Sequence, residues 1–443
     1  MSLALPASPP ALVERIRTWL ANAPQPVFAL YAGLMAFGAY FAMYAFRKPF
    51  TVASYAGVAP VLVDYKTALV IAQVFGYALS KIAGVKVISE TPPHKRAAAI
   101  LALMAAAELT LILFGVVPAP WNIACLFADG LALGMIWGLV FGFLEGRRSS
   151  ELLGAMLCAS FIVSSGVVKS VGEGVMLHGW ANAYWMPAAT GLLFTPLLLF
   201  CVGGLALLPP PSAQDERLRV ARAPMDGAAR RKMFRAFAPG LVALVVIYIG
   251  LTALRDFRDN FAAEIWAGLG FKDDAAIFTF SEVPVAAIVL ATLALLMFIR
   301  NNRLAFLANL GLVAVGLATA GLFSLAFQAH LIGPITWMIA LGAGLYLAYT
   351  PFNALLFDRF IAATGRTGTA GFLIYVADAS GYVSSVALLI LRNCVGLKLS
   401  WVQFLLVISY TTAAVGLLLI VGAGIYFRRR LTRGNVDGQT VQP

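Results

Sequence analysis

Apolar residues in this chain gather in runs of about 20, separated by short polar segments, and the pattern repeats over nearly the whole length. A helix of about 20 residues crosses the hydrocarbon core of a bilayer, because it rises ~1.5 Å per residue. No run alternates polar and apolar positions as a barrel strand would, so the runs predict helices. We count twelve spans, at residues 27–49, 67–85, 97–117, 122–144, 152–171, 185–208, 239–260, 276–299, 304–326, 335–357, 370–391 and 402–427.

Composition agrees with a membrane protein and argues against a soluble enzyme. Of the 443 residues, 61% are hydrophobic and 12% are charged, whereas soluble domains carry about 25% charged residues. The four cysteines lie in apolar segments without a CxxC pair, and the three histidines lie near segment ends. No phosphate-binding loop of the GxxxxGK[ST] type occurs. We therefore expect no enzymatic activity, no metal and no other cofactor.

The formal charge of +12 is explained by membrane topology and not by a nucleic-acid partner. If both termini are cytoplasmic, the inner loops and tails hold 22 of the 32 cationic residues and the outer loops hold four. Cytoplasmic loops are enriched in lysine and arginine. The sequence therefore predicts a multi-pass protein of the plasma (inner) membrane with cytoplasmic N and C termini.

One long polar segment divides the spans into two sets of six. The halves carry similar signals at similar offsets, such as Arg47 and Arg255, which are 208 residues apart. Two repeats of one orientation joined by a basic linker are typical of transporters that rock two bundles about a central site. The predicted parts are an N-terminal segment (1–26), a six-helix bundle (27–208), a cytoplasmic linker (209–238), a second six-helix bundle (239–427) and a tail (428–443).

Six cationic residues lie within or at the edges of the spans, where a charge needs a partner, a cavity or a route to the headgroups. Arg47 and either Arg255 or Arg258 occupy matching places in the two halves. Two guanidinium groups facing one cavity would bind phosphate or carboxylate through paired hydrogen bonds. Arg47 could instead extend its side chain to the outer interface. Tyr44, one turn before it, could donate a hydrogen bond to an oxygen of the solute.

Three motifs resemble those of a known transporter family. The stretch YAFRKPF at residues 44–50 is similar to the YxxRKxF element of the organophosphate:phosphate antiporters of the major facilitator superfamily. Residues 76–96, with Ser80-Lys81 and Gly84, resemble that family's GxSKxxxGxxSDR signature. The GTAGF stretch at 368–372, followed by Gly381-Tyr382, resembles its GTAxGF…GY motif. The match covers the twelve-helix architecture but only about 40 positions closely.

This resemblance implies an alternating-access antiporter in which the arginines of the first and seventh helices bind phosphate. Those positions correspond to Arg47 and to Arg255 or Arg258, and the lysine of the second helix corresponds to Lys81. The family's histidine on the fifth helix has no counterpart in FIVSSG at residues 161–166, although Lys169 could take its place. Asp256 and Asp259 lie beside the arginines of the seventh helix and could neutralise them.

Carboxylates inside the spans are the candidates for ion coupling, because a buried carboxyl group can bind and release a proton. Asp378 on the eleventh helix is the strongest of them, since Ser380 and Gly381 follow it and small residues allow close helix approach. Glu108 and Asp259 are further candidates. For each of these acids the alternative is a structural ion pair or a hydrogen bond to a neighbouring helix.

The sequence favours a secondary transporter for a small anionic organic solute, phosphorylated if the resemblance holds, with protons or inorganic phosphate as the coupled ion. In that interpretation Arg47, Arg255 or Arg258 bind the anion, and Lys81 and Lys169 add positive potential. A proton-coupled symporter of a neutral sugar or peptide-like solute, with Arg47 and Arg258 paired to Asp256 and Asp259, is the alternative. A membrane sensor with a transporter fold ranks third, because the linker and tail resemble no output domain.

Overall fold

Every regular element in the part of the chain that the computed structural model describes is a helix. That part comprises residues 12–145, 147, 150–210, 227–364, 370–394 and 399–433. Much of the predicted linker (211–226), residues 365–369 with the first two residues of the GTAGF motif, and both chain ends lie outside it. The predicted all-α membrane class is confirmed.

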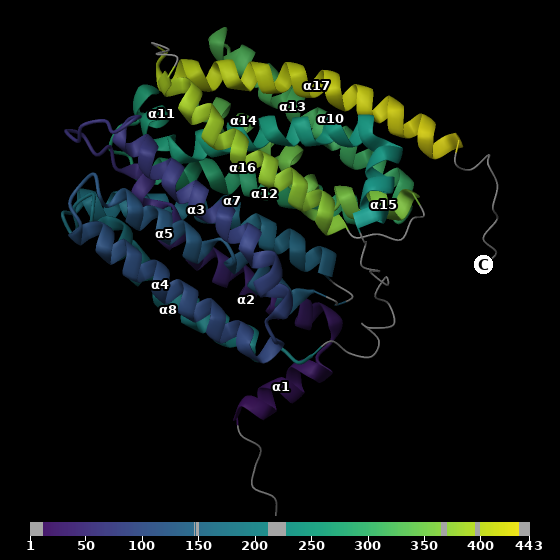
Figure 1. Cartoon of the computed structure of the whole chain (residues 1–443), viewed down its shortest axis with the longest axis horizontal. Helices are drawn as coiled ribbons and strands as arrows, with labels where there is room; N and C mark the ends of the chain where they lie inside the picture. The colour runs from purple at the N-terminus through teal and green to yellow at the C-terminus, as the bar shows by residue number, and fades with distance from the viewer. Residues whose placement is uncertain are drawn as a thin grey trace, which may run out of the picture.

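The first half of the chain forms one group of helices, coloured purple to blue in Figure 1. A short helix, α1 (Leu12–Asn22), precedes the group and lies to one side of it (Figure 1). The helices of the group are α2 (Gln25–Arg47), η1 (Pro49–Val52), α3 (Tyr65–Glu90), η2 (Pro93–Lys95), α4 (Arg96–Val116), α5 (Ile123–Leu133), α6 (Ile136–Leu144), α7 (Ser150–Leu177) and α8 (Met186–Ala206).

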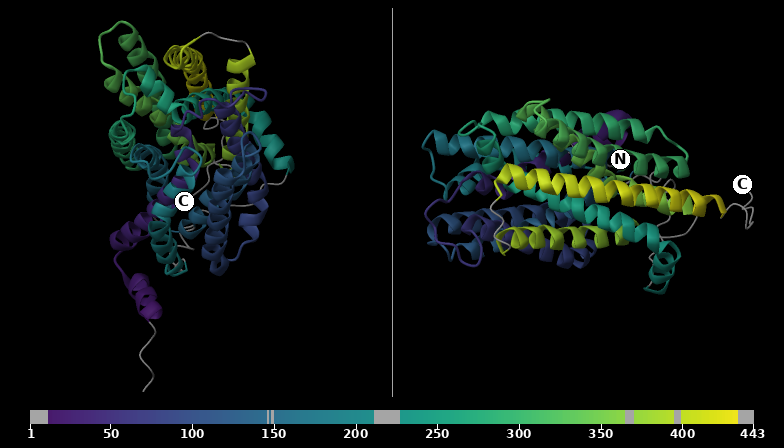
Figure 2. Two further views of the ribbon diagram at one scale, coloured as in Figure 1. Left: turned by 90° about the vertical axis from the view of Figure 1, so that its left-hand side faces the viewer. Right: turned by 90° about the horizontal axis from the view of Figure 1, so that it is seen from above.

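The second half forms a matching group, coloured teal to yellow, and the two groups lie side by side in both the front view and the end-on view (Figures 1 and 2). We call them the N-terminal and C-terminal bundles. The helices of the C-terminal bundle are α10 (Gly227–Asn260), α11 (Ala262–Gly268), α12 (Ala276–Met297), α13 (Asn302–Gln328), α14 (Pro334–Ala354), α15 (Leu356–Thr364), α16 (Ala370–Cys394) and α17 (Trp401–Arg433).

Eleven segments of the described chain are long and apolar enough to cross a bilayer, and they correspond to eleven of the predicted spans. The remaining predicted span, 370–391, coincides with α16. The helices run along the long axis of the molecule, so that α11 marks one end of the bundles and α15 the other (Figure 1). These landmarks define the α11 end and the α15 end.

Two helical segments are irregular in ways that the predicted spans did not indicate. The span at 122–144 is divided into α5 and α6 at Gly134 and Met135. Helix α10 begins at Gly227, inside the predicted linker, and bends at Phe237, whose backbone angles are not helical. Pro239 explains the bend, because proline has no backbone N–H and its ring collides with the preceding turn.

Helices α3 and α5 approach closely because glycines face backbone at their contact. A β-carbon added at Gly130 would lie 2.2 Å from the carbonyl oxygen of Gln73, and one added at Gly76 would lie 2.1 Å from that of Phe127. A backbone oxygen cannot swing away as a flexible side chain can. Only glycine therefore allows this spacing of the two helices.

We expect Gly130→Ala to lower the free energy of unfolding by about 1–3 kcal/mol, the usual cost of overpacking a filled interior. The measurement is thermal unfolding of the purified protein in detergent. Gly174→Ala is the matched control, because a β-carbon there meets nothing within 4 Å. Equal midpoints for the two variants would show that α3 and α5 are not held at this distance.

Candidate functional site

A cavity of about 70 Å³ lies between the two bundles, and helices of both contribute to its wall. That volume accommodates several water molecules or part of a small solute. Its lining is polar and charged to an extent that is unusual inside a membrane protein. The lining residues are Tyr40, Tyr44, Arg47, Lys48, Tyr77, Lys81, Trp137, Cys158, Phe161, Arg255, Asp256, Asp259, Tyr346, Tyr349, Asn353, Ile374, Asp378 and Tyr382.

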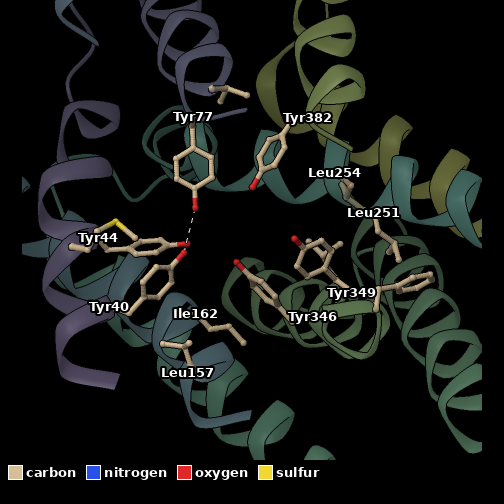
Figure 3. Packing of buried hydrophobic residues seen from close by; sticks show 14 of the residues in the cluster. Tyr40, Tyr44, Tyr77, Leu157, Ile162, Leu251, Leu254, Tyr346, Tyr349 and Tyr382 are labelled. Carbon is tan, nitrogen blue, oxygen red and sulfur yellow. Dashed lines mark hydrogen bonds between the residues drawn. The ribbon is translucent and has the colours of Figure 1, made fainter. Parts of the chain in front are cut away.

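Six tyrosines from four helices form much of the wall. Their hydroxyl groups point toward a common space between the bundles (Figure 3). The hydroxyl oxygens of Tyr40 and Tyr77 are 3.4 Å apart, and those of Tyr248 and Tyr349 are 2.9 Å apart. A phenol both donates and accepts hydrogen bonds, so this wall can form hydrogen bonds with carbonyl, carboxylate and amide groups.

Arg47 is the cation of the wall that has no acidic partner among the residues described. It is the last residue of α2, and only 6% of its surface is exposed. Its guanidinium carbon lies 3.9 Å from the centre of the Tyr77 ring, and its buried Nε atom has no hydrogen-bond partner in the described part of the chain. The side chain therefore faces the cavity and does not extend to the outer interface.

The structure separates the two candidate arginines of α10. Arg255 lines the cavity, stacks over the ring of Tyr349 at 4.3 Å and forms an ion pair with Asp256 at 2.7 Å. Arg258 does not line it; it pairs with Glu282 at 2.7 Å and donates to a backbone carbonyl. Arg255 is therefore the counterpart of Arg47 across the cavity, although an acid already neutralises it.

Asp259 joins the two bundles at the α11 end. Its carboxylate forms ion pairs with Lys48 of the N-terminal bundle, at 2.5 Å, and with Lys169 on α7. It also accepts a hydrogen bond from Ser165. A further ion pair between the bundles, Lys66 with Glu264, lies at the same end. Lys169 thus holds an acid between the bundles and does not line the central cavity; it borders a second cavity of about 10 Å³.

Lys81 and Asp378 link the bundles on the other side of the cavity. Their ion pair measures 2.8 Å, and the second carboxylate oxygen of Asp378 accepts a hydrogen bond from Tyr248. The side chain of Lys81 is 24% exposed, so this pair is less deeply buried than the cluster at Asp259. It joins helices α3 and α16 of opposite bundles and must separate if those helices move apart.

The charges of the wall nearly cancel. Four cations and three carboxylates line the cavity, and each carboxylate is paired with at least one cation. Arg47 alone is left with a positive charge that no carboxylate described here neutralises. No group of histidine, cysteine, aspartate or glutamate in the described residues could hold a metal ion. The site is therefore suited to one anionic group surrounded by hydrogen-bonding partners.

Several residues of the site were not predicted from the sequence. Lys48 belongs to the YAFRKPF motif but had no expected role, and Tyr248 and Asn353, whose side chains are hydrogen-bonded to each other, carry no local sequence signal. Tyr44 lines the cavity as expected. Glu108 lies outside it, with both carboxyl oxygens buried and without a partner among the described residues.

Solved structures share this architecture. A variant of the peptide transporter POT in complex with sulfate covers 96% of this chain and 99% of its own, with a TM-score of 0.59 and 12% identity. A bacterial homologue of the human drug peptide transporters PepT1 and PepT2 covers 91% and 98%, with a TM-score of 0.60 and 12% identity. This similarity establishes the major facilitator fold predicted from the sequence.

Sequence comparison gives a family but no activity. No functionally curated protein matches the chain. One family model covers residues 49–430, which include both bundles apart from α2 and the last three residues of α17. That range holds every charged residue that lines the cavity except Arg47 and Lys48. The chain therefore belongs to a family of unknown function, DUF5690.

Proposed function

We propose that the protein is a proton-coupled symporter of a small peptide-like solute, one that carries a carboxylate together with amide or ammonium groups. The observation that carries the proposal is the charge pattern of the cavity, in which Arg47 alone lacks an acidic partner among the described residues. One free guanidinium group suits one carboxylate, to which it can donate two parallel hydrogen bonds.

The remaining wall fits the rest of such a solute. The tyrosine hydroxyls and the amide of Asn353 can bond a peptide-like group, which both donates and accepts. Tyrosine ring faces attract an ammonium group. The two solved structures named above are of peptide transporters with a similar fold, which supports this solute class.

A phosphate dianion fits the same wall less well. The motif resemblance assigned its binding to Arg47 together with a second arginine and Lys81. Arg255 and Lys81 are instead held by Asp256 and Asp378. A dianion would have to displace both acids from their cations and would be repelled by them at close range. This repulsion raises the free energy of binding more for a dianion than for a monocarboxylate.

We propose that Asp378 couples proton binding to the separation of the two bundles. Protonation would remove the charge that holds Lys81 and so weaken a link between the bundles. Asp259, by contrast, is shared by Lys48 and Lys169, and two cations favour its ionised form throughout the cycle. A solute bound to Arg47 and to groups of both bundles favours closure around itself, the differential interaction that a ligand-driven switch requires.

The distribution of cations in the loops indicates how the protein is oriented in the membrane. We propose that the α15 end lies on the cytoplasmic side of the inner membrane, as the distribution of lysine and arginine in the loops predicts. The ion pairs of Asp259 and Glu264 then close the outer side. In this proposal, the state described is closed toward the outside by these ion pairs.

The proposal predicts that an inward proton gradient drives accumulation of the dipeptide alanylalanine in proteoliposomes. Uptake of labelled alanylalanine should exceed its equilibrium level and collapse when a protonophore is added. Glucose and glycerol phosphate, supplied under the same gradient, should not accumulate. Accumulation of glycerol phosphate in exchange for internal phosphate, without accumulation of the dipeptide, would overturn the proposal in favour of antiport.

A further inference from the structure

The N-terminal bundle contains a buried carboxyl group that no ion pair explains. Asp129 on α5 has 0% of its surface exposed. One of its oxygens, Oδ2, accepts a hydrogen bond from Nε2 of Gln73 at 2.7 Å. The other, Oδ1, is buried and has no partner among the described residues. Buried polar atoms are nearly always satisfied, so this oxygen needs an explanation.

Gln73 connects Asp129 to the cation of the cavity. The same Nε2 atom also donates a hydrogen bond to the backbone carbonyl of Arg47, at 2.9 Å. A single amide group thus bridges the carboxyl of Asp129 and the residue at the end of α2 that faces the solute. Asp129 itself does not line the cavity, so it would act on the solute through Arg47.

The helices packed against α5 bring few charges toward Asp129. Helix α2 places Arg47 near Asp129, and α4 places Glu108 near it. Helix α3 carries Tyr77, whose backbone lies close to Gly130, the residue after Asp129. Among the described residues no cation comes within ion-pair distance of the carboxyl. An ionised carboxylate in such surroundings is strongly disfavoured, while a neutral one is tolerated. The free Oδ1 atom can hold the proton without breaking the bond to Gln73.

We propose that Asp129 is a proton-binding residue that sets the affinity of Arg47 for the solute carboxylate. This inference rests on the proposed function only in assigning the solute to Arg47. An ionised Asp129 opposes the positive potential that Arg47 presents to an anion, and a protonated Asp129 does not. Proton and solute therefore bind more tightly together than apart. Because coupling between two sites is reciprocal, bound solute also favours the proton. Asp129 is thus a positioning residue for symport.

Infrared spectroscopy of the protein in lipid bilayers tests proton binding without any solute. Titration with acid should develop the carbonyl-stretch band of a neutral carboxylic acid, and Asp129→Asn should remove one component of that band. Glu108→Gln is the matched control, since both carboxyl oxygens of Glu108 are buried in the same bundle and have no hydrogen-bond partner among the described residues. A titration of the Asp129→Asn variant that is identical to that of the parent protein would overturn the proposal.

Exchange measurements at equal pH on both sides test the link to Arg47. With labelled alanylalanine as the probe, the half-saturation concentration of the parent protein should fall roughly 5–150-fold from alkaline to acidic pH, the usual range of coupling between two sites. Asp129→Asn, which mimics the protonated form, should hold the low value at every pH. A variant that keeps the parent pH dependence would refute the link.

The two experiments separate failure of the inference from failure of the proposed function. A parent protein that never transports alanylalanine contradicts the proposed function, and the infrared titration still decides whether Asp129 binds the proton. A parent protein that transports the dipeptide with a pH-dependent affinity, which Asp129→Asn leaves unchanged, contradicts the inference alone.

Discussion

Replacing Arg47 with glutamine is expected to raise the half-saturation concentration for alanylalanine by at least about 30-fold. Removing one partner of a buried charged pair costs about 2–5 kcal/mol, and each 1.4 kcal/mol changes an affinity about tenfold. Glutamine retains a hydrogen-bond donor but has no charge. The measurement is uptake into proteoliposomes over a range of dipeptide concentrations.

The same variant should remain folded, which makes the loss of transport interpretable. Arg47 has no ion pair among the described residues, so the change leaves no buried acid without its partner. The main loss is its contact with the Tyr77 ring, worth about 2 kcal/mol. Arg300→Gln, at an exposed position, is the matched control. Parent-like affinity in Arg47→Gln would remove Arg47 from the binding site.

Replacing Asp259 with asparagine is expected to produce the largest loss of stability of any single substitution considered. Lys48 and Lys169 are each about 4% exposed in their side chains and share this one carboxylate. Breaking a buried ion pair costs about 3–5 kcal/mol, because the remaining charge is left uncompensated. Thermal unfolding in detergent should show a midpoint several degrees below that of the parent protein.

Two further variants identify the cause of that loss. Asp274→Asn, at an exposed site on the same end of the molecule, should leave the midpoint unchanged. Asp259→Asn combined with Lys169→Met should recover part of the stability, since it removes one of the uncompensated charges. If the combined variant is less stable than Asp259→Asn alone, uncompensated charge is not the reason for the loss.

The transmembrane helices were predictable because their signal is local. A run of about 20 apolar residues has one stable solution in a bilayer, and each predicted span is mainly helical in the structure. The irregularities were not predictable from hydropathy. At the break between α5 and α6, Gly134 lies so close to α3 that an added β-carbon would be 2.6 Å from the carbonyl oxygen of Tyr77. Such a contact is set by tertiary packing.

The charged residues of the site were also predictable, but their pairing was not. A cation within a span is conspicuous in sequence, which is how Arg47, Arg255 and Lys81 were found. Arg255 and Arg258 are three residues apart and so occupy nearly the same helix face. Which of them reaches the cavity depends on their partners, Asp256 and Glu282, and Glu282 belongs to another helix. Sequence alone does not contain that geometry.

The anionic solute favoured by the sequence illustrates the same limit. Counting cations within the spans suggested a strongly positive cavity. In the structure Asp256, Asp259 and Asp378 neutralise most of that charge from within the cavity wall. The acids had been identified, yet only the fold shows that they face the same space as the cations. The preference for a solute with one carboxylate therefore comes from the structure.

The central claim is that Arg47 binds a solute carboxylate inside the cavity, and a cycle that changes both partners tests it most directly. Calorimetry would measure the affinity of the parent protein and of Arg47→Gln for alanylalanine and for its C-terminal amide, which lacks the carboxylate. The account predicts that the parent protein binds the acid much more tightly than the amide and that Arg47→Gln binds the two equally. An equal preference for the acid in both proteins would contradict it.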